Sequence, residues 1–143
     1  MLFKDHVSSL ARQAQLKVAV SSDRQAHLLF TVNDNVRHVF VIAYSEIWEF
    51  SCPTNSEVDS ATDIPDVITA AVLERNAKLN RGCWAIETVS NKRRLECMHK
   101  CDHTLLTPAE FSKICWALAN EVDHLENALL QAAQALKNRN LCK

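Results

Sequence analysis

The sequence predicts an α+β fold in which a five-stranded, antiparallel-rich sheet carries helices packed on one face. The first observation is an apolar stripe, repeating at steps of three and four, that runs from Thr107 to about Asn138 and indicates one long helix. The second is a set of short apolar or alternating segments between polar turns, which indicates the strands that this helix covers. With 143 residues, 48% of them apolar, the chain suits a single domain over residues 1–143. The predicted element order is α-β-β-β-α-β-β-α.

The first predicted element is a helix over residues 2 to about 16. Leu2, Val7 and Leu10 fall on one side of such a helix, and the charged residues lie mostly elsewhere. Alternating apolar residues between Leu16 and Val20 then indicate an extended exit from the helix.

Three strands are predicted next. The run from Val39 to Ala43 contains no polar residue, which is typical of a strand covered on both faces. If helices cover one face of the sheet, this run leaves Phe40 and Ile42 on the other, where a second subunit or a bound segment would cover them. Pro53 ends the third strand because it has no N–H for the sheet. The predicted ranges are 25–32, 36–44 and 46–52.

The second half of the chain predicts a helix, a hairpin and the long helix. Asp63 or a neighbour caps the middle helix, and Gly82 ends it in a left-handed conformation. The hairpin strands are residues 83–89 and about 94–101. Thr107, with Pro108 and Glu110 after it, is typical of a helix start. The middle helix is expected to bury Ile64, Val67, Ile68, Ala71, Val72 and Leu79.

Charge and composition exclude several classes of function. The net charge of −1 and the pI of about 6.6 argue against a nucleic-acid partner. The basic run from Lys92 to Arg94 is interpreted as a solvated turn. A single glycine, Gly82, excludes glycine-rich phosphate loops. With no targeting or membrane-spanning segment in the sequence, the protein is expected to be cytoplasmic, with reduced cysteines and no membrane partner.

Cys97, His99, Cys101 and His103 place four potential zinc ligands at alternate positions. Residues six apart on a strand are separated by about 20 Å, whereas the ligands of one zinc ion lie within about 4 Å of one another. We therefore interpret residues 95–101 as a half-buried strand face and predict no metal or cofactor. The remaining alternatives are a partial metal site at Cys101 and His103 and a nucleophilic cysteine, which would need a lowered thiol pKa.

Tryptophans are the sequence's candidates for partner contact, because this residue type dominates binding hot spots. Trp116 sits at the edge of the long apolar stripe and is the best candidate for exposure or a dimer contact. Trp48 is the second tryptophan candidate, and Phe40 and Ile42 are further candidates for partner contact. Core packing is the alternative for each of them.

The element order resembles the type III secretion chaperone-like fold, and the stretch from Val72 to Trp84 resembles the helix-to-strand passage of its YbjN-like branch. The likeness continues through residues 105–111 and through Leu118, Glu121 and Leu125. It implies a soluble dimer that acts as a chaperone or adaptor for another polypeptide, and it transfers no invariant functional residue.

The resulting hypothesis is a non-enzymatic, polypeptide-binding chaperone-like or adaptor-like module, forming a homodimer and binding an unidentified protein client. One alternative is a metal- or thiol-dependent protein that uses residues 97–103. Another is a structural subunit that docks into a larger assembly through the long helix.

Overall fold

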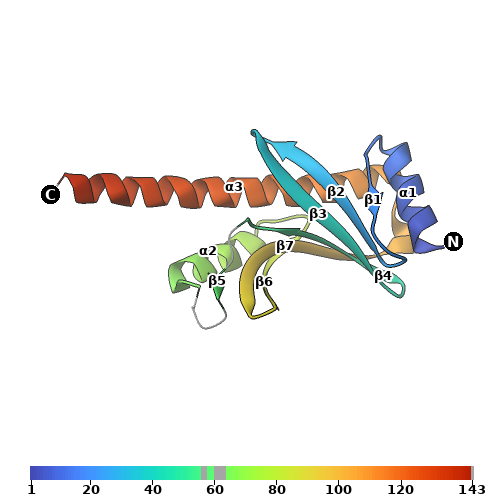
Figure 1. The fold of residues 1–143 in the computed structure, drawn as a ribbon, viewed down its shortest axis with the longest axis horizontal. Coiled ribbons are helices and arrows are strands. Elements are labelled where there is room, and N and C mark those ends of the chain that lie inside the picture. The colour runs from blue at the N-terminus through green and yellow to red at the C-terminus, as the bar shows by residue number, and fades with distance from the viewer. Residues whose placement is uncertain (56–57, 60–63, 143) are drawn as a thin grey trace.

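The computed structural model describes residues 1–55, 58–59 and 64–142 and has the predicted α+β architecture (Figure 1). The helices are α1 (Phe3–Gln13), α2 (Asp66–Asn76) and α3 (Pro108–Leu141), with a short 3-10 helix, η1 (His103–Leu105). The strands are β1 (Ala19–Val20), β2 (Gln25–Val32), β3 (Asn35–Tyr44), β4 (Ile47–Pro53), β5 (Val58–Asp59), β6 (Cys83–Val89) and β7 (Lys92–Asp102). The predicted order is confirmed, with β1 and β5 added as two-residue strands.

All the strand pairs of the described residues are antiparallel. The order across the sheet is β1-β2-β3-β4-β7-β5, and β6 pairs with the long strand β7. The described residues thus form a sheet of seven strands where the sequence predicts five. The difference lies in β1 and β5, because two residues are too few to show an alternating pattern.

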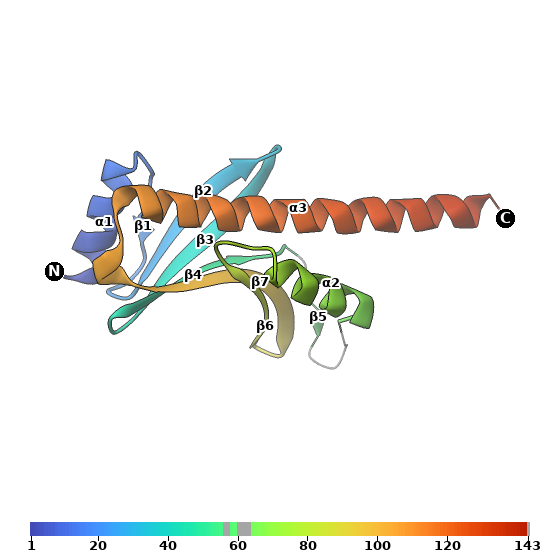
Figure 2. The same cartoon turned by 180° about the vertical axis from the view of Figure 1, so that it is seen from behind.

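The three helices lie on one face of the sheet (Figures 1 and 2). The first half of α3 crosses β2, β3, β4 and β7, while α1 packs beside its start. Helix α2 lies near β6, and Arg75 on α2 pairs with Glu121 on α3 at 2.8 Å. We call the helix-bearing side the covered face and the other side the open face.

The core lies between the covered face and the helices. Val39 and Val41 of β3 are fully buried there, against helix residues such as Phe111, Cys115 and Leu118. Thr107 caps α3 as predicted, accepting a hydrogen bond from the backbone N–H of Glu110 at 3.1 Å. Cys115 is fully buried as a small core residue of α3.

The long helix differs from the prediction in how much of the sheet it covers. Residues up to about Leu125 pack on the body of the protein, and the rest of α3 projects beyond it (Figure 2). The apolar stripe continues onto this projecting part, where Leu136 is 61% exposed. The stripe therefore indicates the helix correctly but overstates the packing of its second half.

Helix α2 ends earlier and buries less than predicted. It ends at Asn76, and within it only Val72 is fully buried, while Val67 is 76% exposed and Ala71 is exposed. These two residues contradict the predicted buried side, because α2 touches the body along a narrow line near β6. The predicted cap Asp63 lies outside the described residues.

Gly82 has the predicted left-handed conformation, with φ of +85°, but it lies directly before β6 rather than at the end of α2. A Cβ atom at this position would lie 2.6 Å from a methyl carbon of Leu118 and 3.0 Å from the sulfur of Cys97. The glycine is needed both for its backbone angle and for the close approach of α3.

Candidate functional site

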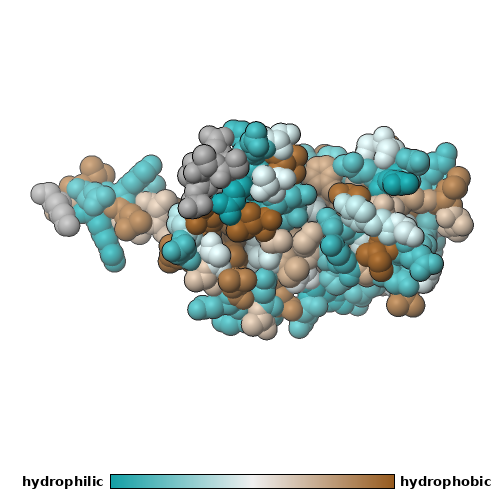
Figure 3. Space-filling model, turned by 90° about the horizontal axis from the view of Figure 1, so that it is seen from below, coloured by the Kyte–Doolittle hydropathy of each residue, from teal (hydrophilic) through white to brown (hydrophobic). Residues whose placement is uncertain are grey.

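The open face is the part of the molecule that combines apolar side chains with a pocket. Alternation along β3 sends Val39, Val41 and Ala43 to the covered face and leaves Phe40 and Ile42 half-buried on the open face. Figure 3, which views the molecule from below, shows hydrophobic patches separated by hydrophilic groups on that side. On the open face, Phe40 and Ile42 line one pocket together with the polar Gln25, Glu49 and Ser51, so this face is mixed in character rather than uniformly apolar.

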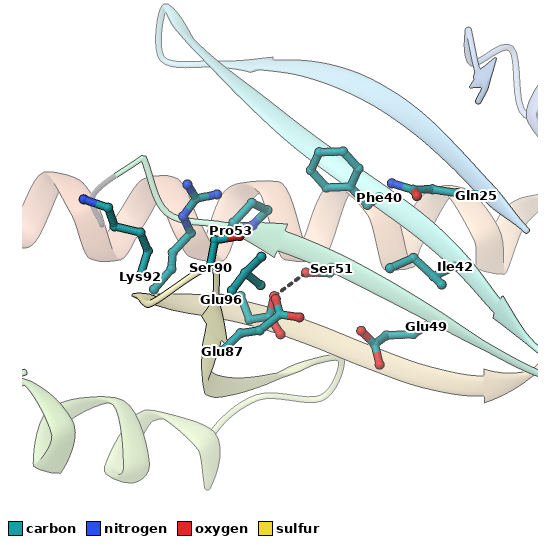
Figure 4. A pocket seen from close by; sticks show the side chains of 12 residues that line it. Gln25, Phe40, Ile42, Glu49, Ser51, Pro53, Glu87, Ser90, Lys92 and Glu96 are labelled. Carbon is teal, nitrogen blue, oxygen red and sulfur yellow. Dashed lines mark hydrogen bonds between the residues drawn. The ribbon is translucent and has the colours of Figure 1, made fainter. Parts of the chain in front are cut away.

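A pocket of about 510 Å³ lies in the open face (Figure 4). Phe40 and Ile42 stand on one side of it, while Glu87 and Glu96 project from the β6–β7 hairpin on the other. The lining residues are Gln25, Phe40, Ile42, Glu49, Ser51, Pro53, Glu87, Val89, Ser90, Lys92, Arg94 and Glu96. We call this space the open-face pocket.

Carboxyl groups lie deep in the open-face pocket. Glu96 is 3% exposed, and the hydroxyl of Ser51 donates a hydrogen bond to it at 2.7 Å. Burial, and after it a hydrogen bond with the Glu87 carboxyl, raise the pKa of Glu96 to about 7. Near neutral pH this carboxyl therefore exchanges a proton readily. Glu49 is also buried, with an oxygen 3.5 Å from the Lys100 ammonium.

The sequence missed these carboxyls. Glu49, Ser51 and Glu96 alternate with apolar residues, a pattern that is typical of side chains facing solvent, yet all three are buried. The β6–β7 end of the sheet curves (Figure 1), and on this part of the sheet the Glu87 carboxyl forms a hydrogen bond with Glu96. Alternation shows which face a residue takes, but it carries no signal for this curvature.

Three stacked rings extend the apolar side of the open face. His27 lies flat against Phe40, with ring centroids 4.8 Å apart, and its Nε2 is 2.8 Å from Nδ1 of His38. Partial burial, together with the neighbouring His38, lowers the pKa of His27. The neutral form of the His27 imidazole is therefore favoured beside the apolar ring of Phe40.

The basic run differs from its interpretation as a turn. The turn consists of Ser90 and Asn91, both with positive φ, and Lys92 to Arg94 form the first residues of β7. Lys92 and Arg94 line the open-face pocket, and Arg93 lies on the covered side beside Leu95. These cations are therefore part of the sheet.

The four Cys and His residues of 97–103 are separated by the structure. Cys97 is buried near Gly82, and His99 accepts a hydrogen bond from the Gly82 N–H at 3.2 Å. The chain turns after Asp102, so the His103 ring stacks on Trp48. Its Nδ1 lies 3.3 Å from Nδ1 of His6 on α1. Among the described residues, no group of three or more potential ligands could hold a metal ion.

Thiol chemistry finds little support in the same strand. Burial is the main cause that raises the pKa of Cys97, and it also raises the pKa of Cys101. Both effects disfavour the thiolate that a nucleophile requires. Leu95 and Cys97 are buried and His99 and Cys101 are half-buried, as the sequence predicts for this face of the strand. Glu96 on the opposite face is buried as well, so the strand does not alternate as predicted.

The two tryptophan candidates take different places. Trp48 is 2% exposed and packs beneath α1, against Phe3 and His6. Trp116 is 39% exposed on α3, where its ring meets Phe30 edge-on at 4.6 Å. Partner contact at these positions stays a prediction, and Trp116 is the one with accessible surface.

A second charged cluster, also missed by the sequence, fastens α3 to the covered face. Arg37 is 2% exposed and donates to Asp123 from Nε and Nη2 and to Glu126 from Nη1, at 2.8–3.1 Å. Asn33 and Asn35 also donate to Asp123. Burial by itself would raise the pKa of Asp123, but these hydrogen bonds outweigh it and lower the pKa. The cluster satisfies its charges within the chain and serves packing.

Comparison with known proteins bears on the fold. No protein-family model matches the chain, and no curated protein matches its sequence. A chain in a solved structure of the HopA1-SchA chaperone-effector complex superposes with a TM-score of 0.60. The fold is type III secretion chaperone-like. The match covers 85% of this chain and 91% of that chain at 8% identity, so the likeness concerns the fold alone.

The chaperone-like fold confirms the predicted fold class, while the YbjN-like branch stays a prediction. No described helix has the length and apolar character needed to cross a bilayer.

Proposed function

We propose that the chain is a non-enzymatic, polypeptide-binding module of chaperone-like or adaptor-like type, that it forms a homodimer in the cytoplasm, and that its client lies across the open face. The observation that carries the proposal is the open-face pocket, with Phe40 and Ile42 half-buried beside it. The chaperone-like fold supports it by analogy, as does the resemblance of the stretch from Val72 to Trp84 to the YbjN-like branch.

The chemistry of the open face suits a polypeptide better than the other classes of partner. A peptide presents apolar side chains together with N–H and C=O groups, and the pocket offers Phe40 and Pro53 beside Ser51 and Glu96. The net charge of −1 gives little attraction for nucleic acid or for an anionic membrane. Trp116 is proposed as a further partner contact, and Trp48 supports the sheet from within.

A pull-down from the native extract tests the client site. We compare the wild-type chain with Phe40→Ser and with a matched control, Val36→Ser, which lies on the same strand and face but outside the pocket. A hot-spot side chain lost from an interface costs about 2 kcal/mol or more, so client recovery at limiting concentration should fall at least about tenfold with Phe40→Ser. The control should keep its client. Equal recovery with both variants would contradict a client site at the pocket.

A structural subunit is the second candidate, because half of α3 projects from the body. In the same pull-down, this function predicts one stoichiometric partner that Phe40→Ser retains and that a chain ending after Glu126 loses. A client-binding module predicts instead that Phe40→Ser loses the client and that a chain ending after Glu126 retains it. No contact or thiol pKa in the described residues favours the metal- or thiol-dependent alternative.

A further inference from the structure

The projecting part of α3, residues 127–141, is the largest feature that the client site does not use; we call it the α3 tail. Leu130, Leu136 and Leu141 are 67%, 61% and 83% exposed there. Figure 2 shows the α3 tail extending away from the sheet and the other helices. An amphipathic helix usually owes its stability to the packing of its apolar face, so this exposure calls for a partner.

The sequence of the α3 tail is unusual for a solvated helix. Residues 127–136 read Asn-Ala-Leu-Leu-Gln-Ala-Ala-Gln-Ala-Leu and contain no charge. Exposed helices normally carry charged residues on the solvent side, whereas buried interfaces are depleted in them. The composition of the α3 tail therefore indicates a helix that is covered in the working form of the protein.

One face of the α3 tail continues the stripe that packs on the body. At 100° per residue, Leu129, Ala132, Ala133 and Leu136 fall on one side of the helix, within about 60° of one direction. The two alanines at the middle would let a second helix approach closely. Leu141 points to a different side and lies off this face.

An apolar pocket of about 130 Å³ opens where the α3 tail leaves the body. Ile64, Ile68, Leu95 and Leu129 contribute to its lining, between α2 and α3. The apolar face of the α3 tail thus runs directly into a ready cavity for an aliphatic side chain.

Charge decides the orientation of a helix that could cover this face. The far end of the α3 tail carries Lys137 and Arg139, whereas Asp123 and Glu126 at its root are already paired with Arg37 within the chain. Two such helices side by side in parallel would bring the basic ends together, where they repel. In the antiparallel arrangement, the two basic ends lie at opposite ends of the pair.

We propose that the α3 tail is the homodimer contact and that a second copy of the chain covers it antiparallel, crossing near Ala132 and Ala133. This inference rests on the homodimer of the proposed function. Leu129 then lies opposite the partner's Leu136, which extends into the apolar pocket between α2 and α3. The open-face pocket, on the other side of the sheet, stays accessible to the client.

Light scattering on the full chain tests the contact at a protein concentration of about 10–50 µM. A dimer whose dissociation constant lies below this range is mostly assembled at that concentration. We expect twice 16.1 kDa for the wild type, the monomer mass for Leu136→Glu, and the dimer mass for the matched control Leu141→Glu. Both variants change an exposed leucine, so helix content by circular dichroism should stay constant. A dimer that survives Leu136→Glu overturns the inference but leaves the proposed homodimer standing.

A wild-type chain that is monomeric in this range overturns both the α3 tail contact and the homodimer. Client binding is then judged separately by the Phe40→Ser pull-down.

Cysteine cross-linking tests the orientation. In the antiparallel pair the two Cys142 thiols are about 28 Å apart at 1.5 Å per residue, whereas a parallel pair brings them together. Under mild oxidation we expect no disulfide between Cys142 residues, and a rapid one for Ala133→Cys combined with Cys142→Ser. A disulfide between the native Cys142 residues, removed by Cys142→Ser, would overturn the antiparallel arrangement.

Discussion

Both faces of the sheet bury carboxyl groups, but the surroundings shift the pKa of these groups in opposite directions on the two faces. On the covered face, hydrogen bonds from Arg37, Asn33 and Asn35 lower the pKa of Asp123. On the open face, burial and a neighbouring carboxyl raise the pKa of Glu96 to about 7. On the covered face, the ionised form of Asp123 is stabilised in the folded chain. On the open face, ionisation of Glu96 destabilises the folded chain.

The difference separates a site that holds the fold together from a site suited to a partner. Removing one member of a fully hydrogen-bonded, buried ion pair strongly lowers the free energy of unfolding, because the other charge stays buried without its partner. A buried carboxyl with a raised pKa makes the folded state less stable above that pKa, and a bound cationic or hydrogen-bonding group can recover this stability. We therefore expect substitutions on the two faces to differ in sign and not just in size.

The largest expected effect is on the covered face, in Asp123→Ala. Removing this carboxylate leaves Arg37 buried without its main partner, so the free energy of unfolding should fall by about 3–5 kcal/mol. Urea unfolding at pH 7 measures it. Lys100→Ala, which removes the exposed partner of Glu49, should change stability by less than about 1 kcal/mol. A loss below about 1 kcal/mol for Asp123→Ala would contradict the contrast between the faces.

The open face predicts the opposite sign for Glu96→Gln. The pKa of Glu96, about 7, lies above its ordinary value of 4.5, so the folded chain keeps this proton while the unfolded chain has released it. Wild-type stability should therefore fall as pH rises from 4.5 to 7, and Glu96→Gln should abolish that fall. The variant should gain up to about 3 kcal/mol over the wild type at pH 8, relative to pH 4.

Thermal unfolding across this pH range measures the effect, with the exposed Glu87→Gln as a control of smaller expected effect. A variant that parallels the wild type at every pH would show that Glu96 is ionised like an ordinary carboxyl.

A third substitution, Gly82→Ala, tests how tightly α3 is seated on the covered face. The added Cβ meets Leu118 at 2.6 Å and requires a positive φ of 85°, so we expect a loss of about 1–3 kcal/mol. Asn91→Gly is the matched control, because Asn91 also has a positive φ of 61° but lies in an exposed turn. This control should be neutral or slightly stabilising by calorimetry.

The smallest effect is expected for Ile42→Ser on the open face, compared with Val41→Ser next to it on the covered face. Val41 is fully buried, and its replacement should cost about 2–4 kcal/mol of unfolding free energy. Ile42 is half-buried, so its replacement should cost about 1 kcal/mol or less while weakening client recovery. Equal losses of stability would mean that both sides of β3 are core.

The sequence by itself determined the elements and the faces they present. Alternation along β3 separates Val41 from Ile42, and the cap at Thr107 marks the start of α3, because these signals depend on backbone geometry over a few residues. It also indicated that Cys97, His99, Cys101 and His103 do not converge, since the spacing along a strand is known in advance.

The tertiary structure alone decided which charged residues pair with one another and which residues are buried from water. Arg37 and Asp123 are 86 residues apart in the chain, and no local pattern links them. Glu96 is buried because the β6–β7 end of the sheet curves, and the stripe on α3 leaves the sheet after about Leu125 because the sheet ends there. Burial depends on the neighbours that a finished fold supplies, so a periodic sequence shows which side a residue takes but not what covers it.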